Sequence, residues 1–202
     1  MNTRDRSGAA SPDLQYHVLG RMPELPPWMA ARLTLPDDYF VGCPTLVQPL
    51  SRGQVTLRSD VPDEDPLIQP NYLQCEADAL TFVRGIEQMR ALLATPSLRE
   101  FVRDGAPAFA IPGATGTPRP LPAGTGSALR EFVARTPTTP WHPVGTCKLG
   151  LDHLAVVDPA LRVHGLDGLR VADASIIPVI PSGNINAACI MIGEKCADLV
   201  AR

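Results

Sequence analysis

Residues 76–93, with the sequence EADALTFVRGIEQMRALL, carry the longest helical signal in the chain. The apolar residues of this stretch recur at three- and four-residue spacing, which places them on one face of a helix: Leu80, Val83, Ile86, Met89 and Leu93. The stretch therefore predicts a long amphipathic helix that buries one side against a core. Shorter and more irregular elements are expected on both sides of it.

Short apolar runs before this helix predict a small sheet. Residues 13–20, DLQYHVLG, alternate imperfectly between apolar and polar and predict a strand. CPTLVQPL at 43–50 and GQVTLRSD at 53–60 predict a strand pair joined by a turn at Ser51-Arg52. Strands that precede a long helix favour the α+β class, with a mixed or antiparallel sheet and helices.

The chain after the long helix alternates between helical pieces and irregular stretches. SLREFVRDG predicts a second helical piece that ends at Gly105, and SALREFVARTPTTP, starting at Ser127, predicts a short amphipathic helix. Residues 106–126 are rich in Gly, Pro and Ala and predict a loop. AVVDP and LRVADAS predict two short strands, and PSGNINAACIMIGEKCADLVAR predicts a final helix.

The composition indicates a soluble globular chain, since 45% of the 202 residues are hydrophobic and 19% are charged. The formal net charge of −3 excludes the strongly basic surface that nucleic acid or anionic lipid attracts. No apolar run approaches membrane-spanning length, and the start, MNTRDRSGAASPD, lacks an apolar signal core. We therefore expect a cytoplasmic protein without a nucleic-acid partner or a transmembrane segment.

The five cysteines show neither CxxC nor zinc-like spacing, which predicts free thiols and no metal site. The 22 prolines imply much irregular backbone. Three parts follow from this pattern. Residues 1–12 predict a disordered lead, residues 13–135 a sheet-and-helix body, and residues 136–202 a strand–strand–helix unit typical of the end of a nucleotide-binding domain.

His142 is the first candidate for chemistry, in the stretch TPTTPWHPVGTCKLG at 136–150. Pro143 disfavours the helical region for the residue before it, so His142 is expected to be extended, with its ring in a fixed direction. Such a setting suits an ordinary buried turn histidine. It equally suits a general base, because imidazole titrates near neutral pH. The residues alone leave both alternatives open.

The entry to the last helix, GNINAACI, supplies a second candidate. Asparagine is a favoured N-cap, so we expect one of Asn184 and Asn186 to cap the helix and the other to face a cavity. The N-terminus of a helix also favours a developing negative charge, as on an anion or on a cofactor that becomes anionic when reduced. Asp173 follows a short apolar run, where α/β sheets bind ligands, but it could equally be a turn or cap carboxylate.

Other nucleophiles and ligands fit ordinary structural roles. Cys147 lies five residues after His142, which raises a thiol–imidazole pair or a metal site as alternatives. No further ligand cluster accompanies this pair, so a small buried cysteine is expected. Ser175 and Ser182 lack the GxSxG elbow, which leaves a Ser–His esterase unsupported. The remaining histidines stand in strand or turn contexts: His17, His153 and His164.

Several motifs together resemble one enzyme family. WHPVGTCKLG, followed by VVDPALRVHGLDGLRVADASIIPVIPSGNINAACIMIGEKCADLV, resembles the C-terminal region of the glucose–methanol–choline (GMC) family of flavin-dependent oxidoreductases. The choline-dehydrogenase-like and alcohol-dehydrogenase-like members are the most similar. PLSRGQVTLRSDVPDEDPLIQPNYL resembles the start of that family's substrate-binding region. The resemblance runs from about Leu14 to the C-terminus, with the motifs in the family's order and separations.

The resemblance implies both a fold and a set of site residues. Residues 13–135 would form a substrate-binding domain, and 136–202 the active-site segment and terminal strand–strand–helix part of a Rossmann-like FAD-binding domain. His142 matches the family's catalytic base and Asn186 its second active-site position, at a separation of 186 − 142 = 44 residues. The implied flavin contacts are Trp141 near the substrate cavity, Asp173 and Ala174, and Asn186 and Ala187 at the start of the last helix.

The implied activity is oxidation of a primary or secondary alcohol, a small molecule, to a carbonyl. His142 would take the hydroxyl proton while Asn186 donates a hydrogen bond to the substrate oxygen, and the hydride would pass to FAD. The sequence identifies neither the alcohol nor the electron acceptor. Aromatic residues make up 5% of the chain, which does not favour the aromatic cage that a quaternary ammonium such as choline prefers.

One feature departs from the family pattern. The family holds the ADP part of FAD in an N-terminal βαβ unit with a Gly-rich fingerprint, and here GATGT at 113–117 lies in a Pro-rich loop without flanking elements. The expectation is a C-terminal fragment that is inactive alone and needs an N-terminal FAD-binding half, from the same gene or a separate chain. A catalytically silent interaction module and a lyase on the same scaffold are the alternatives.

Overall fold

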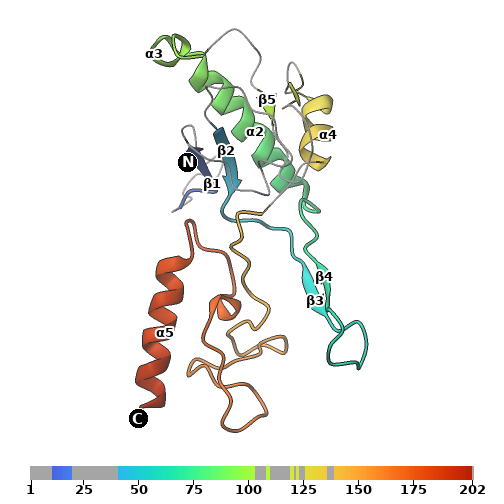
Figure 1. The fold of residues 1–202 in the computed structure, drawn as a ribbon, viewed down its shortest axis with the longest axis vertical. Coiled ribbons are helices and arrows are strands. Elements are labelled where there is room, and N and C mark those ends of the chain that lie inside the picture. The colour runs from blue at the N-terminus through green and yellow to red at the C-terminus, as the bar shows by residue number, and fades with distance from the viewer. Residues whose placement is uncertain are drawn as a thin grey trace. The chain divides into compact units, whose positions relative to one another are not determined.

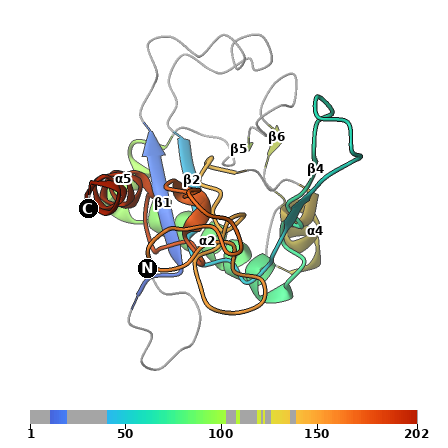
Figure 2. The same ribbon diagram turned by 90° about the horizontal axis from the view of Figure 1, so that it is seen from below.

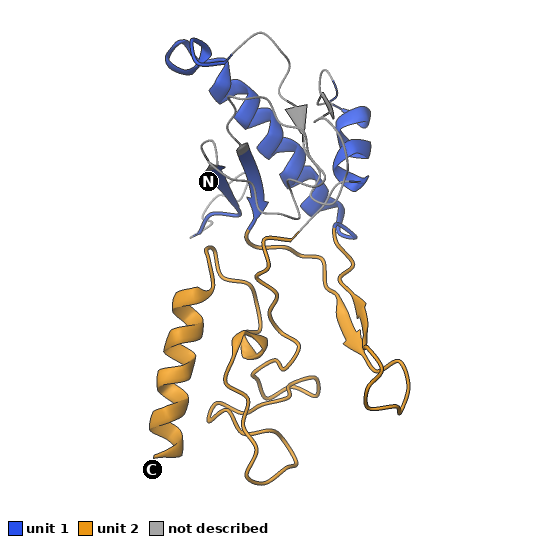
Figure 3. Ribbon diagram, viewed as in Figure 1, with its two compact units in different colours: residues 1–46, 73–138 blue, residues 47–72, 139–202 orange. Residues whose placement is uncertain are grey.

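The computed structural model describes residues 11–19, 41–102, 108–109, 119–120, 122, 126–135 and 139–201. The chain divides into two compact units, shown in Figure 3: unit 1 comprises residues 1–46 and 73–138, and unit 2 comprises residues 47–72 and 139–202. Most of the expected disordered lead (1–12) and of the expected loop at 106–126 lies outside the described residues.

Unit 1 contains an antiparallel pair formed by β1 (Leu14–Leu19) and β2 (Val41–Leu46), which lie side by side in Figures 1 and 2. The register sets Leu14 opposite Leu46 and Leu19 opposite Val41. The predicted strand at 13–20 is thus confirmed. The predicted pairing of the runs at 43–50 and 53–60 is wrong, because β2 begins earlier and takes β1 as its partner.

The helices of unit 1 follow the apolar periodicity closely. The long helix α2 (Glu76–Leu93) has the predicted bounds, and α4 (Ser127–Arg135) confirms the predicted amphipathic helix. The piece between them, α3 (Pro96–Arg99), is a single turn and shorter than predicted. Within the stretch predicted as a loop, β5 (Ala108–Phe109) pairs with β6 (Arg119–Pro120), which the Gly- and Pro-rich composition did not reveal.

The core of unit 1 forms where α2 meets α4 and the β1–β2 pair. Val83 and Ile86 of α2 pack with Leu129 and Val133 of α4, and all four are buried. On another face of α2, Gly85 allows close approach of the sheet, since a Cβ there would stand 2.9 Å from Leu14 Cδ2 and 3.0 Å from Pro44 Cβ. The Tyr16 hydroxyl lies 2.9 Å from the Gly85 carbonyl oxygen, to which it donates a hydrogen bond.

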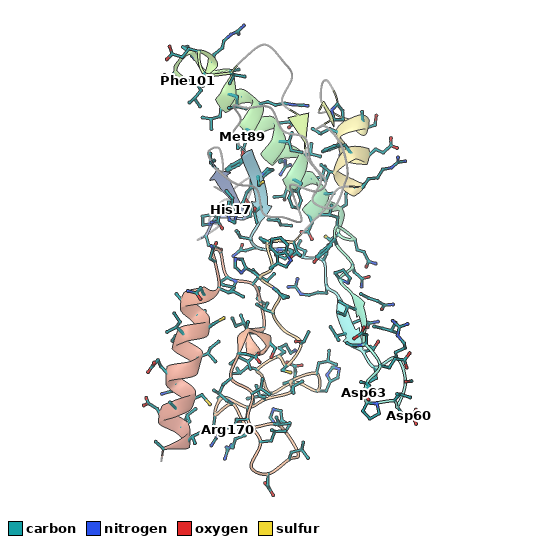
Figure 4. The ribbon with its side chains drawn as sticks, viewed as in Figure 1. His17, Asp60, Asp63, Met89, Phe101 and Arg170 are labelled. Carbon is teal, nitrogen blue, oxygen red and sulfur yellow. The ribbon has the colours of Figure 1, made fainter. Side chains whose placement is uncertain are left out.

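Unit 2 begins with a hairpin of β3 (Gln54–Thr56) and β4 (Leu67–Gln69), with Val55 opposite Ile68. The acidic loop between the two strands includes Asp60 and Asp63, which are labelled in Figure 4. Its closure comes from Arg58, whose Nε donates to the Asp65 carbonyl at 3.2 Å, and from the Ser59 hydroxyl, which donates to the Glu64 carboxylate. These local bonds explain why β3 pairs forward with β4 rather than back with β2.

The remainder of unit 2 is mostly irregular. It contains the 3-10 helix η1 (Ala174–Ile176) and the final helix α5 (Asn186–Val200), which confirms the predicted last helix. The two short strands predicted from AVVDP and LRVADAS are wrong. In their place are isolated bridges between Leu149 and Val157, Val157 and Val163, and Arg162 and Arg170, because each apolar run is interrupted after a few residues by a turn.

A small core holds this irregular chain. Val157, Leu161, Ile176 and Ile192 are buried together, and Ile192 belongs to α5. Partly buried apolar residues surround this cluster: Leu149, Val156, Val163, Val171, Ala172, Ile177, Cys196 and Leu199. One core therefore joins the irregular segments around Val157 and Ile176 to the last helix.

The division into units differs from the domain boundaries expected from the sequence at one segment. Residues 47–72 group with residues 139–202 rather than with the body predicted at 13–135. The hairpin supplies its own strand pairing, and Gln48 Nε2 donates to Ser182 Oγ at 2.8 Å, which ties the segment to the stretch before α5. The last segment of unit 2 starts at residue 139.

Candidate active site

His142 lies in a segment without regular secondary structure, and its side chain is half-buried. Neither ring nitrogen has a hydrogen-bond partner among the residues that the structure describes. A half-buried imidazole in this state can exchange a proton with a molecule that enters from outside the protein.

The residue before it, Trp141, has an unusual backbone. Its φ of 59° lies in the left-handed region, which a bulky side chain adopts at a cost of about 1–2 kcal/mol. The Trp141 N–H donates to Thr139 Oγ1 at 3.0 Å, and the indole is 69% exposed. Sequence reasoning assigned the rigidity of this segment to proline and overlooked Thr139. The signal was present, because threonine often hydrogen-bonds the N–H two residues later.

The stretch after His142 is attached to η1. The Cys147 N–H donates to the Ser175 carbonyl at 3.0 Å, and the Leu149 N–H donates to the Ile176 carbonyl at 2.9 Å. Gly145 makes the turn that leads into these bonds, with a φ of 90° that favours glycine. The segments that carry His142 and Asp173 are thus bound to each other through their backbones.

Asp173 caps η1. Its carboxylate accepts the Ser175 N–H at 2.7 Å, which confirms the cap alternative for this residue. The Ser175 hydroxyl and N–H hold the pKa of the Asp173 carboxyl below its ordinary value. The hydroxyl nevertheless forms no hydrogen bond of good geometry, and Ser175 Oγ is a buried polar atom without a partner among the described residues. Ala174, the next predicted residue, begins η1 and is half-buried.

The start of α5 differs from the expectation in one respect. Ile185 occupies the N-cap position, so the prediction that an asparagine takes this position is wrong. Ile185 is buried, and its apolar anchoring explains why it lies at the boundary in place of a polar cap. Asn186 is the first helical residue, and both Asn186 and Ala187 are exposed. The Asn186 carboxamide has no hydrogen-bond partner among the described residues.

The structure places all the predicted site residues in unit 2: Trp141, His142, Asp173, Ala174, Asn186 and Ala187. Their segments share the core that contains Leu149, Ile176 and Ile192. His142 and Asn186 do not hydrogen-bond to each other, which leaves the polar groups of both side chains available to a third molecule.

The cysteines and the other histidines of unit 2 do not form a metal-binding cluster with His142 among the described residues. Within the described ranges, no group of three or more His, Cys, Asp or Glu residues could hold a metal ion. His164 Nε2 lies 3.1 Å from the Gly150 carbonyl oxygen, which supports the structural role expected for it.

None of the helices in the described part of the chain has the length and apolar character needed to span a bilayer.

Comparison with known proteins identifies the motif-bearing region. The family model described as GMC oxidoreductase matches residues 49–193, which is most of the chain. The chain belongs to the GMC oxidoreductase family. The resemblance expected from the sequence is therefore confirmed.

Individual GMC relatives agree with this assignment. The chain is 37% identical over 198 residues to the oxygen-dependent choline dehydrogenase of Escherichia coli, a match that covers 98% of this chain and 33% of the relative. It is 37% identical over 192 residues to an alcohol dehydrogenase [acceptor] of Pseudomonas putida, covering 95% of this chain and 32% of the relative. The chain thus spans about a third of the length of the curated relatives it matches.

Solved GMC structures share the fold. Pyridoxine 4-oxidase from Mesorbium loti matches with a TM-score of 0.63 and 35% identity, over 79% of this chain and 28% of that protein. A formate oxidase from Aspergillus oryzae, described in connection with FAD modification, matches with a TM-score of 0.68 and 31% identity, over 83% of this chain and 28% of that protein. These relatives imply a flavin cofactor.

The donor groups of unit 2 fit a flavin. The first N–H groups of α5 have no partner within the helix, and Ile185 has no side-chain oxygen to cap them, so the exposed start of α5 presents donors and a positive dipole end. The unpartnered Ser175 Oγ adds a further polar atom next to Asp173 and Ala174. This donor set suits the polar edge of an isoalloxazine or a ribityl hydroxyl.

Proposed function

We propose that this chain is the substrate-binding and catalytic portion of an FAD-dependent oxidoreductase that converts a primary or secondary alcohol to a carbonyl. Membership of the GMC family and the similarity to choline and alcohol dehydrogenases support this reaction class. One observation carries the proposal. Two polar side chains, His142 and Asn186, lack partners among the described residues and belong to segments tied through one small core.

His142 acts as the general base. A half-buried neutral imidazole without an internal partner can accept the hydroxyl proton of an alcohol. Removing that proton raises the electron density on the carbinol oxygen, which makes loss of hydride from the same carbon easier. The bound flavin supplies the hydride acceptor. Trp141, largely exposed beside the imidazole, borders the substrate.

Asn186 holds the same substrate oxygen. Its carboxamide N–H groups donate to the oxygen as negative charge develops there, and a donor fixed at the start of a helix needs little reorganisation. The exposed N-terminus of α5, with Asn186 and Ala187, would hold the polar edge of the flavin. Asp173 and Ala174 would hold another part of the cofactor, next to the Ser175 hydroxyl, which has no partner among the described residues.

The ADP part of FAD is bound by a βαβ unit outside these residues, because the sequence contains no Gly-rich fingerprint between a strand and a helix. Residues 13–135 shape the substrate side, and residues 136–202 complete the active site and the end of the FAD-binding domain. The partner is thus an N-terminal FAD-binding half, joined in the same polypeptide or supplied as a second chain.

Anaerobic mixing tests the reaction class. The chain, assembled with its flavin-binding part, is loaded with FAD and mixed without oxygen with a series of small alcohols. An oxidoreductase bleaches the oxidised flavin absorbance in proportion to carbonyl formed. Product formation without bleaching would instead identify a lyase, and the absence of both with every alcohol would favour an interaction module. The His142→Ala variant, similarly loaded, should retain the oxidised spectrum over the same time.

A further inference from the structure

Two prolines restrict the backbone on both sides of the pair Trp141–His142. Pro140 and Pro143 have φ fixed by their rings, and each disfavours the helical region for the residue before it. Thr139 and His142 are those preceding residues, so both are directed to extended conformations. Trp141 has no such restriction, and its φ and ψ contribute to the direction in which the chain enters His142.

Trp141 adopts the conformation that its side chain favours least. Its φ of 59° is left-handed, and the surrounding structure must hold it there. The hydrogen bond from the Trp141 N–H to Thr139 Oγ1, 3.0 Å long, provides such a restraint. Pro140 lies between these two residues and fixes its own φ, which removes one of the backbone torsions that separate the Thr139 hydroxyl from that N–H.

We propose that Thr139 is a positioning residue for the imidazole of His142: its hydroxyl holds the Trp141 N–H, fixes Trp141 in the left-handed conformation and thereby sets the direction of the His142 ring. This proposal rests on the function proposed above for His142. Thr139 itself touches neither substrate nor flavin in this account. Without its hydroxyl, Trp141 returns to an ordinary φ and turns the following residue away from the substrate oxygen.

The predicted effect of Thr139 on the conformation of Trp141 is tested by NMR, without an activity assay. In the isotope-labelled 202-residue chain, a positive φ at Trp141 gives a strong intraresidue cross-peak between its amide and α protons, and the hydrogen bond slows exchange of its amide proton. We expect both signatures in the wild type and in Thr139→Ser, which retains the hydroxyl. Both should disappear in Thr139→Val, which has the same shape without the acceptor. Thr139→Ala serves where Thr139→Val does not fold. A wild-type chain that lacks the signatures would overturn the proposal.

The functional part uses the enzyme assembled with its flavin-binding part. Thr139→Val is expected to lower kcat about 10- to 100-fold, with little change in KM, because a small misplacement of a catalytic group is sufficient for such a loss. Thr139→Ser should stay close to the wild type. The proposal fails if Trp141 changes conformation and kcat does not, or if kcat falls while Trp141 keeps its positive φ.

These outcomes are separate from a failure of the proposed function. If His142→Ala turns over as fast as the wild type, His142 is not the base, whatever the conformation of Trp141. If His142→Ala is inactive and Thr139→Val is fully active, the base is correctly assigned and only the positioning role is wrong.

Discussion

Unit 1 and unit 2 differ in the interactions that stabilise each of them internally. In unit 1, a long helix packs against a shorter helix and a strand pair, and these described elements are built from repeating backbone hydrogen bonds. Unit 2 has one long helix and the short β3–β4 hairpin, and much of its remaining described chain is fixed by single bonds between turns, such as those from Cys147 to Ser175 and from Leu149 to Ile176. All the candidate site residues belong to the second kind of structure.

The difference shows how each part supports function. A repeating ladder tolerates many sequences, since backbone groups bond irrespective of side chain. An irregular chain needs particular residues at particular positions: a glycine at 145, prolines on both sides of Trp141 and His142, and a carboxylate at Asp158. The same local restraints give a reactive side chain a definite direction. We therefore expect that substitutions at the candidate site residues of unit 2 affect turnover, whereas substitutions in the core of unit 1 affect stability.

The largest expected effect is on the base itself. His142→Ala in the assembled enzyme should lower kcat by about 10²–10⁴-fold, the usual contribution of a general base, with little change in flavin content. Steady-state kinetics with flavin quantified by absorbance measures both. His153→Ala is a matched control, because His153 is an exposed histidine of the same unit and should turn over like the wild type. If His142→Ala turns over nearly as fast as the wild type, His142 is not the base, and the assignment of catalysis to unit 2 loses its main support.

Substitution of one helical glycine in each unit tests how tightly the two helices are packed. Gly85→Ala in α2 should lower the free energy of unfolding by about 1–3 kcal/mol, because the new Cβ would stand 2.9 Å from buried Leu14 and 3.0 Å from Pro44. Gly193→Ala in α5 should raise it by about 0.5–1 kcal/mol, since nothing lies within 4 Å and alanine favours helix. Urea unfolding of both variants measures this. Equal effects of the same sign would contradict the described packing.

A single carboxylate tests the irregular part of unit 2. Asp158 accepts the N–H groups of Ala160 and Arg162 at 2.8 and 2.9 Å, and the Arg162 N–H and side chain hold the pKa of the Asp158 carboxyl below its ordinary value. A lowered pKa stabilises the fold above the unfolded-state value near 3.9, and this contribution is lost as pH falls through the folded-state pKa. Asp158→Asn should therefore lower Tm by a few degrees at neutral pH.

The destabilisation by Asp158→Asn should shrink as the pH falls below about 4, where the wild-type carboxylate also becomes protonated. Thermal unfolding followed by circular dichroism at several pH values measures the difference. Asp167→Asn, at an exposed carboxylate in the neighbouring turn, should leave Tm unchanged at every pH. A loss that stays constant with pH would show that the charge of Asp158 is not what stabilises this turn.

The smallest effect is expected at Cys147. Its backbone N–H makes the bond to Ser175, and serine has the same N–H, so Cys147→Ser should change kcat and flavin content by less than about 2-fold. Steady-state kinetics measures this as well. A large loss of turnover would revive the thiol–imidazole alternative with His142.

The sequence predicted the regular elements better than the irregular ones. The helices at 76–93 and 127–135 and the strand at 14–19 repeat a local pattern, so their side chains report the structure directly. The pairing of β3 with β4 depends on bonds within the acidic loop, and the bridges around Val157 depend on turns that no period encodes. The N-cap at Ile185 was missed because burial of its side chain outweighed the preference for asparagine.

The candidate site residues, in contrast, lie at irregular segments and were still selected from the sequence. His142 and Asn186 were selected from motifs rather than from periodicity, and the structure places both in one unit. Thr139 was overlooked, since its importance depends on the left-handed φ of Trp141, which no residue preference predicts for tryptophan.

A double-mutant cycle on kcat/KM tests the central claim most directly. His142→Ala, Asn186→Ala and the double variant are assayed in the assembled enzyme with one alcohol substrate. If both side chains act on the same oxygen in the same step, the loss in the double variant is much smaller than the product of the two single losses. Losses that multiply would show that the two side chains act independently, which would contradict a shared substrate oxygen.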